Sequence, residues 1–295
     1  MDRLTIDAHL HVWDLDRATY SWLTPELAPL NRTKTYDEVG PDLAAAGIRG
    51  AVLVQSADNA EDTANMFAVA SQHPGIVGVV GYVPLERPAD AAQQLEELRS
   101  TSLFVGIRNL IHDRPDPDWL LRPDVDEGLG ILEDAGIPFD VVAVLPRHLE
   151  LIPLISDRHP GLRMVIDHLA KPPIGLASNE PWDSLITVAA ENPNVFAKVS
   201  GLYSAAGDQG SWSVESIRPY FDRAVELFGA ERLMYGGDWP MSVLAGGYPR
   251  VWAGLEQLFE SLDESQRDAI QGRTAADFYG IDPVRIAALD PESVE

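Results

Sequence analysis

Histidines with a spacing of two residues are the first sign of chemistry in this chain. His9 and His11 follow an apolar run that begins at Leu4, and Asp7 stands two residues before His9. Side chains two positions apart on a strand point to the same face, so both imidazoles are expected on one side. Two such imidazoles can chelate a divalent cation or polarise a carbonyl group. The spacing therefore predicts metal-assisted or hydrolytic chemistry.

Further reactive side chains occur where later apolar runs end. Arg108 and Asn109 close one run, His168 closes another with Lys171 shortly after it, and Asp238 closes the last. A further run ends in Lys198-Val199-Ser200-Gly201. Groups at the carboxyl ends of parallel barrel strands converge on one pocket. We therefore predict one site, with His9, His11, His168 and Asp238 at its centre.

The positioning elements are eight short, apolar, β-rich runs separated by helix-like segments. The runs are 4–8, 50–55, 76–83, 103–109, 138–144, 163–168, 195–200 and 233–238, and amphipathic stretches include 60–72, 89–99, 149–158 and 216–228. Such runs are typical of parallel strands buried on both faces. Eight strands, with no glycine-rich phosphate loop after the first, favour an α/β fold of the (β/α)8 TIM-barrel type over a doubly wound sheet.

The domain organisation is predicted to be one barrel over residues 1–295. Residues 12–35 form a long insert with Trp13, Tyr20 and Trp22, expected to lie over the site as a wall, or to pack against the barrel without touching a ligand. After Gly246 the pattern predicts helices at 252–262, 264–272 and 274–279, and residues 281–295 read as a tail.

Composition excludes several classes of function. The net charge of -24 disfavours binding to nucleic acid or to an anionic membrane surface. The chain has no cysteine, which excludes disulfides, thiolate zinc sites and cysteine nucleophiles. No apolar run is long enough to span a bilayer and no signal peptide is apparent, so we expect a cytoplasmic protein.

The other histidines divide into two groups. His73 and His159 lie in turns that end helices, and His148 lies in a helical stretch, so all three are expected to be structural. His112 follows the fourth run and is within reach of the site rim.

At these residues the chain resembles the amidohydrolase superfamily, in particular the amidohydrolase-2 branch with its sugar lactonases of the L-fuconolactonase type. The matching segments are IDAHLHVWD at 6–14, YSWLTPELAPL at 20–30, VGIRN at 105–109, DWLLRPD at 118–124, IDHLAKPPI at 166–174, KVSGL at 198–202 and RLMYGGDWP at 232–240. They cover nearly the whole chain in order. They are specific for the branch and less specific for the substrate.

The resemblance implies a lactonase that uses water to open a ring ester. Asp238 would be the general base, and His9, His11 and His168 would bind a metal or polarise the lactone carbonyl, with His168 also catalytic. Arg108 and Lys171 would hold the developing carboxylate or sugar hydroxyls, and Gln55, Asn109 and Trp239 would complete the substrate contacts. Relatives often carry histidine at the position of Asn109, and an amide there cannot accept a proton.

Several questions stay open at the level of sequence. One optional divalent, zinc-type metal is expected, for which three histidines and one aspartate (His9, His11, His168 and Asp238) suffice. Arg108 and Lys171 could instead supply the electrophilic field of a metal-independent enzyme, and a binuclear site is not expected. A metal-dependent decarboxylase and a non-catalytic barrel that binds a sugar acid are the alternative functions. The expected partner is a small lactone, and the sequence leaves homo-oligomer formation open.

Overall fold

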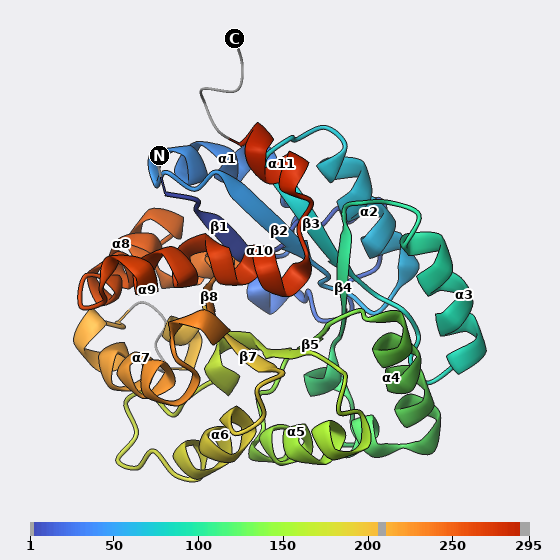
Figure 1. Cartoon of the computed structure of the whole chain (residues 1–295). Helices are drawn as coiled ribbons and strands as arrows, with labels where there is room; N and C mark the ends of the chain where they lie inside the picture. Colours follow the sequence, from blue (N-terminus) through green and yellow to red (C-terminus); the bar gives the residue numbers. More distant parts are fainter. Residues whose placement is uncertain (1–2, 206–210, 290–295) are drawn as a thin grey trace.

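The core of the molecule is a closed barrel of eight parallel strands (Figure 1). The computed structural model describes residues 3–205 and 211–289. The strands are β1 (Ile6–Leu10), β2 (Gly50–Val54), β3 (Ile76–Gly81), β4 (Phe104–Asn109), β5 (Phe139–Val141), β6 (Met164–Ile166), β7 (Val195–Val199) and β8 (Leu233–Tyr235). Each pairs in parallel with the next. Hydrogen bonds between the segments after β8 and β1, at 2.8 Å from Asp238 N to His9 O, close the ring.

Helices surround the barrel on the outside, as Figure 1 shows. They are α1 (Tyr36–Ala45), α2 (Ala60–Ala70), α3 (Pro88–Leu98), α4 (Pro123–Ala135), α5 (Pro146–Arg158), α6 (Trp182–Ala190), α7 (Val214–Phe228), α8 (Tyr248–Phe259), α9 (Glu264–Asp268), α10 (Thr274–Tyr279) and α11 (Pro283–Ala288). None of these described helices combines the length and apolarity needed to cross a membrane. The alternation confirms the predicted (β/α)8 barrel, since strands buried on both faces require a helical cover.

The bounds of β1, β6 and β8 differ from the prediction in ways that affect the site. β1 begins and ends two residues later than expected, which puts His9 inside the strand. β6 ends at Ile166 and β8 at Tyr235, earlier than expected. After β8, a Cβ on Gly236 would lie only 2.6 Å from the Cβ of His9. The missing side chain therefore lets this segment pass close to β1 and carry Asp238 towards the histidines.

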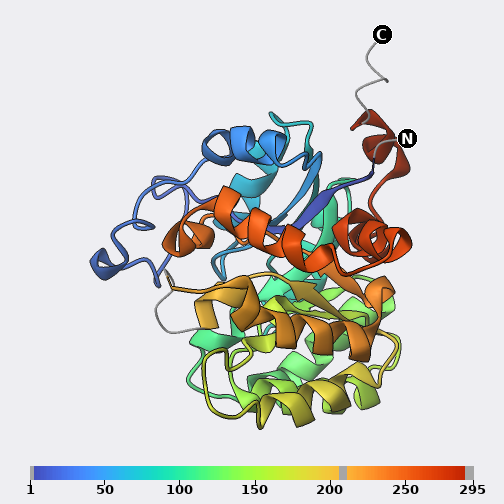
Figure 2. The same ribbon diagram turned by 90° about the vertical axis from the view of Figure 1, so that its left-hand side faces the viewer.

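The two ends of the barrel carry different segments (Figure 2). The insert of residues 12–35 lies at one end, and α10 and α11 lie at the other. The predicted tail is corrected in part, because residues 283–288 form α11, and Ile286 and Leu289 pack against the apolar cluster that includes Ile6. The rest of that tail, from residue 290, lies outside the described residues.

Aromatic side chains anchor the insert to the barrel. The indole of Trp22 donates to Ser56 O at 2.7 Å, and the hydroxyl of Tyr20 donates to the Asp62 carboxylate at 2.8 Å. Trp13 and Tyr20 are buried, and Trp22 packs against their small cluster. Because each ring buries an apolar body and satisfies a polar tip, the insert forms a fixed wall of the barrel mouth.

Candidate active site

A cavity of about 260 Å³ opens at the carboxyl ends of the strands. It is lined by His11, Trp13, Trp22, Ser56, Arg108, Leu110, His112, Val142, Val144, His168, Lys171, Asp238 and Met241. These residues come from β4 and from the segments that follow β1, β2, β4, β5, β6 and β8. The two tryptophans show that the insert contributes to the cavity wall, rather than packing elsewhere. A largely apolar pocket with few convergent polar groups is typical of a small-molecule site.

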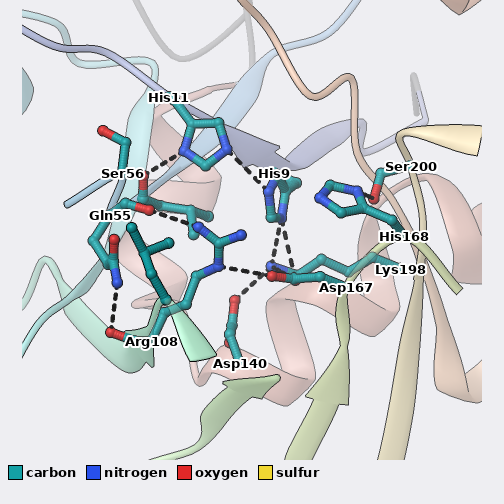
Figure 3. Close-up of polar contacts among 12 residues, drawn as sticks. His9, His11, Gln55, Ser56, Arg108, Asp140, Asp167, His168, Lys198 and Ser200 are labelled. Carbon is teal, nitrogen blue, oxygen red and sulfur yellow. Dashed lines mark hydrogen bonds and ion pairs between the residues drawn. The ribbon is translucent and has the colours of Figure 1, made fainter. Parts of the chain in front are cut away.

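Three predicted centre residues meet at the floor of this cavity, which His11 and Asp238 line (Figure 3 shows the two histidines). The Nε2 atoms of His9 and His11 are 3.1 Å apart. Oδ1 of Asp238 lies 3.6 Å from His11 Nε2 and 3.9 Å from His9 Nε2. All three side chains are at least nine-tenths buried. The expectation that His9 and His11 share one side of the chain is therefore confirmed.

The orientation of His11 is set by a backbone carbonyl. Its Nδ1 lies 2.7 Å from the carbonyl oxygen of Val54, which can only accept a hydrogen bond. Nδ1 therefore carries a proton, and in the neutral ring Nε2 presents a lone pair towards His9 and Asp238. Neutral His11 can thus serve as a metal ligand, but its Nε2 cannot donate a hydrogen bond to a developing oxyanion.

His168 reaches the site from an unusual backbone conformation. Residues 168–171 form a run of left-handed conformations, with φ of 55° at His168 and 53° at Lys171, and Asp238 has φ of 52°. Left-handed non-glycine residues cost about 1–2 kcal/mol each and persist where surrounding structure enforces them, often at functional sites. Nδ1 of His168 lies 2.8 Å from Ser200 Oγ, which fixes the ring (Figure 3).

The local charges keep Asp238 ionised. Burial alone would raise its pKa, but the neighbouring His168 and His11 rings and Lys171 outweigh burial and lower the pKa to about 2. The hydroxyl of Tyr203 also donates to Oδ2 of Asp238 at 3.0 Å. Burial lowers the pKa of His168 well below its usual value, and the charge of Asp238 opposes this effect. A buried carboxylate beside imidazoles can hold a cation or accept a proton from water.

The donor set fits one divalent cation. Ligand atoms of His9, His168 and Asp238 all lie within 4.8 Å of one another, and His11 adds a fourth nitrogen beside them. Two ligands of one tetrahedral zinc lie roughly 3.3 Å apart, given bonds of about 2.0–2.1 Å. The distances of 3.1, 3.6 and 3.9 Å among His9, His11 and Asp238 bracket that value. These residues could therefore hold a metal with little rearrangement.

Basic side chains line another part of the cavity. Arg108 is held by Asp167 at 2.8 Å and by Gln55 O at 2.8 Å, and it lines the cavity together with Lys171. His112 lines it too, so the predicted reach to the rim is confirmed. Burial, together with Arg108, lowers the pKa of His112 to about 4. This side of the cavity suits a carboxylate or sugar hydroxyls.

Three predicted contact residues lie behind the cavity wall instead. The amide of Gln55 donates to Arg108 O at 2.8 Å, and the amide of Asn109 donates to Val83 O at 3.1 Å. Trp239 is buried, and its carbonyl oxygen accepts from His11 N at 2.7 Å. None of Gln55, Asn109 and Trp239 lines the cavity described above. Their role as substrate contacts therefore stays a prediction, and the hydrogen bonds named here join them to the backbone around the cavity.

Sequence reasoning noted Lys198 but missed its pairing with two buried carboxylates below the histidines. Asp167 and Lys198 contact each other at 3.2 Å, and Lys198 also contacts Asp140 at 2.5 Å. All three are fully buried. Their signal was a charged residue inside an otherwise apolar strand, which is rare unless it is paired.

Two of the histidines predicted to be structural make hydrogen bonds within the fold. His159 lies between Glu133 and Asp126, and Nδ1 of His148 accepts from backbone amides at the start of α5.

Comparisons with known proteins agree with this architecture. Residues 6–281 match the profile of the Amidohydrolase family Amidohydro_2. The chain is 34% identical to an L-fucono-1,5-lactonase of Burkholderia ambifaria over 94% of this chain and 96% of the relative. It is 30% identical to an L-fucono-1,5-lactonase of Burkholderia multivorans over 95% and 97% of the two chains.

A solved structure shares both the fold and the order of the elements. It is an amidohydrolase of Burkholderia multivorans with bound zinc, which superposes with a TM-score of 0.87 at 29% identity and covers 95% of this chain and all of that one. The profile match spans most of the chain, and the barrel, the convergent histidines and the aspartate after β8 are all in place. This chain belongs to the amidohydrolase family.

Proposed function

We propose that this protein is a hydrolase that opens a sugar lactone by attack of water on the ring ester. The observation that carries the proposal is ionised Asp238 beside His9, His11 and His168 at the floor of a cavity, with Arg108 and Lys171 on its wall. A lactone carbonyl needs a polarising group on one side, and its product needs a site for a new carboxylate. The relatives named as lactonases support the same reaction.

The residues take complementary roles in this proposal. Asp238 accepts a proton from the attacking water, and the hydrogen bond from Tyr203 orients its carboxylate. Arg108 and Lys171 attract the negative charge that develops as the ring opens. The apolar wall of Trp13, Trp22 and Val142 excludes water from the rest of the ring, which strengthens these electrostatic contacts.

We further propose that the metal is one zinc-type ion held by His9, His11, His168 and Asp238. Bound there, it would act as a Lewis acid towards the ring ester. The tautomer of His11 supports the role of ligand over that of oxyanion donor, because Nε2 of the neutral ring carries a lone pair. The solved relative with zinc and the donor set of this chain both support the assignment.

The test is a pH-indicator assay over a panel of aldonolactones, including L-fucono-, L-rhamnono- and D-galactonolactones. The enzyme would be used as purified, after chelator treatment, and after resupply of zinc. We expect proton release that disappears with chelator and returns with zinc. Release that survives complete metal removal would contradict the metal proposal and leave the lactonase standing.

The same assay separates the other candidate functions. Lactone hydrolysis releases a proton, whereas decarboxylation consumes one or leaves the pH little changed and produces carbon dioxide. Turnover of no lactone under any metal condition, together with carbon dioxide release from an aromatic acid, would replace the lactonase with the decarboxylase. Saturable binding of sugar acids without turnover would replace it with a binding protein.

A further inference from the structure

A second cavity adjoins the active-site cavity, and we call it the side cavity. Its volume is about 420 Å³, and Trp22 and Leu110 line both cavities, so these two side chains lie at the border between them. The other lining residues come from the insert, from the segment after β2 and from the segment after β4. The side cavity therefore lies at the same end of the barrel as the candidate active site.

A third cavity, of about 290 Å³, extends this row of cavities. It shares Thr19 and Asn59 with the side cavity, and it is lined by further residues of the insert and by Glu61 in the first turn of α2. The row leads from the active-site cavity past Trp22 and along the insert. A ligand bound at the histidines can therefore extend past Trp22 into the side cavity.

Polar side chains of the side cavity are fixed by contacts within the protein. Oδ1 of Asp58 accepts from Leu110 N at 2.9 Å and from the Gln55 amide at 3.1 Å. Oδ2 of Asp58 accepts from Arg114 at 2.7 Å, and the guanidinium of Arg114 lies 3.8 Å over the ring of Trp119. Because these groups are held in place before a ligand arrives, binding costs them little conformational freedom.

The charges of the side cavity favour a neutral ligand. Its charged lining residues are Asp58, Asp113 and Arg114, which leaves one acidic group in excess, so a phosphate or carboxylate is repelled. A cation gains little from Asp58, because Arg114 already pairs with that carboxylate. Thr19 and Ser21 add hydroxyl groups, which both donate and accept hydrogen bonds. A neutral group rich in hydroxyls matches this lining.

Trp22 adds the apolar surface that a sugar ring needs. A pyranose carries its hydroxyls on its rim and presents C–H groups on its faces, so an aromatic ring can pack against a face while polar side chains bind the rim. The indole of Trp22 is held by its hydrogen bond to Ser56 O at 2.7 Å. An aromatic border next to fixed carboxylate and guanidinium groups therefore has the chemistry of a carbohydrate subsite.

We propose that the side cavity is a glycosyl subsite, and that the preferred substrate is an aldonolactone carrying a further neutral sugar on a hydroxyl remote from the ring ester. The lactone carbonyl would lie at the histidines and Asp238, so the added sugar leaves from the opposite end of the lactone and passes Trp22. Water still cleaves the ring ester alone, and the glycosidic bond stays intact. The inference rests on the proposed function, because it names the substrate class of that reaction.

The kinetic test compares cellobiono-, lactobiono- and melibionolactone with D-glucono-1,5-lactone, their common parent. The pH-indicator assay measures kcat/KM after subtraction of spontaneous hydrolysis. We expect at least one of the three to exceed the parent by about tenfold, roughly the return of one or two additional hydrogen bonds. Values for all three that are equal to or below that of the parent would overturn the inference.

A blocking variant tests whether the side cavity causes the preference. Ser21 is exposed and lines the side cavity, so Ser21→Tyr places a bulky ring in it. We expect the ratio of kcat/KM between the aldobionolactone and its parent to fall to about one. Ser265→Tyr, at an exposed site on α9, is the matched control and should keep the wild-type ratio. A wild-type ratio in Ser21→Tyr would place the added sugar elsewhere.

A second pair of variants tests the polar contacts. Arg114→Met keeps a long side chain against Trp119 but removes the guanidinium, and Arg114→Lys keeps a cation within reach of Asp58. We expect Arg114→Met to raise KM for the aldobionolactone several-fold more than KM for the parent, and Arg114→Lys to restore part of the difference. Equal changes of KM for both substrates in Arg114→Met would contradict a contact of Arg114 with the added sugar.

Binding of the acid products separates this inference from the proposed function. Calorimetry compares cellobionate, lactobionate and melibionate with gluconate, so no turnover is required. We expect a Kd about tenfold lower for at least one aldobionate, and loss of that difference in Ser21→Tyr. Tighter binding of an aldobionate without turnover of any lactone would keep the subsite and reject the proposed function. Lactone turnover with no preference for a glycosylated member in either assay would reject the subsite and keep the function.

Discussion

Asp238 is both buried and ionised, although burial by itself disfavours the ionised form of a carboxylate. The group is buried, which favours the neutral acid, yet His168, His11 and Lys171 bring its pKa down to about 2. An ionised carboxylate in a cavity of low polarity is available throughout the neutral pH range. It can serve as proton acceptor and ligand without first losing a proton.

Replacement of Asp238 by asparagine should separate catalysis from folding. We expect kcat to fall by about 10²–10⁴-fold, because an amide cannot take a proton from water. The variant should stay folded, since asparagine has nearly the same shape. Initial rates and thermal unfolding measure the two properties. Asp222→Asn, an exposed change on α7, is the control, and substantial lactonase activity in Asp238→Asn would refute its assignment as the base.

His112 should make stability depend on pH in the acidic range. Its pKa is lowered from 6.5 to about 4 in the folded protein, chiefly by burial. As pH falls below 6.5 the unfolded chain takes up a proton that the folded chain does not, so the contribution of His112 to stability declines and levels off near pH 4. The loss should be about 2 kcal/mol after allowance for partial exposure of the ring.

Urea unfolding of wild type and His112→Gln at several pH values measures this effect. The difference in unfolding free energy between the two proteins isolates the histidine from other titrating groups. We expect the unfolding free energy of wild type to fall relative to that of His112→Gln as the pH is lowered from 7 to 4. A difference that is constant over this range would show that the histidine titrates alike in the folded and unfolded chains.

Among the elements, the turn after β6 carries the most backbone strain. Ala170 has φ of 57° within the left-handed run. Glycine adopts this conformation without a steric penalty, so Ala170→Gly should stabilise the protein by about 0.5–1 kcal/mol. Ala64→Gly, at an exposed site inside α2, should instead destabilise by about 1 kcal/mol. Chemical denaturation measures the unfolding free energy of both variants. A change of the same sign in the two variants would contradict backbone strain at Ala170.

The insert over the barrel mouth offers a test of its contact with substrate. Trp22 lines the cavity while its indole donates to Ser56 O at 2.7 Å. Trp22→Leu should raise KM by about tenfold with little change in kcat, because it removes a contact made equally to ground and transition states. Trp22→Phe keeps an aromatic face and should lose less. Equal kinetic constants in all three proteins would place Trp22 outside the substrate contact.

At the scale of the whole molecule, the candidate metal site joins the last strand to the first. His9 lies in β1, and Asp238 follows β8, so an ion held by both residues would bridge the seam where the barrel closes. Zinc at about 100-fold above its Kd should therefore raise the unfolding free energy by about 2.7 kcal/mol. His9→Gln should lose most of this gain, and His73→Gln, away from the site, should keep it. Urea unfolding with and without zinc measures the shift, and no shift in wild type would contradict binding at the seam.

The apolar pattern was sufficient to predict the fold. Each strand is a short run of buried residues, such as Val52 and Leu53, followed by an amphipathic helix, and local hydrophobic periodicity records both. The order of the elements and their number then leave few topologies, because parallel strands with helical crossovers wind in one hand. The charged residues at the strand ends could also be predicted from the sequence, because they occur at the carboxyl end of one apolar run after another.

The sequence by itself determined which residue types are present at the carboxyl ends of the strands, because strand period and order are local properties of the chain. The tertiary structure decided which of them share a cavity and which face the wall. Gln55 and Asn109 occupy the expected strand ends but direct their amides to backbone carbonyls. Tyr279 meets Asp140 across 139 positions of sequence. Such contacts depend on the closure of the barrel and on the left-handed turns that redirect His168 and Asp238, which no local pattern of residues records.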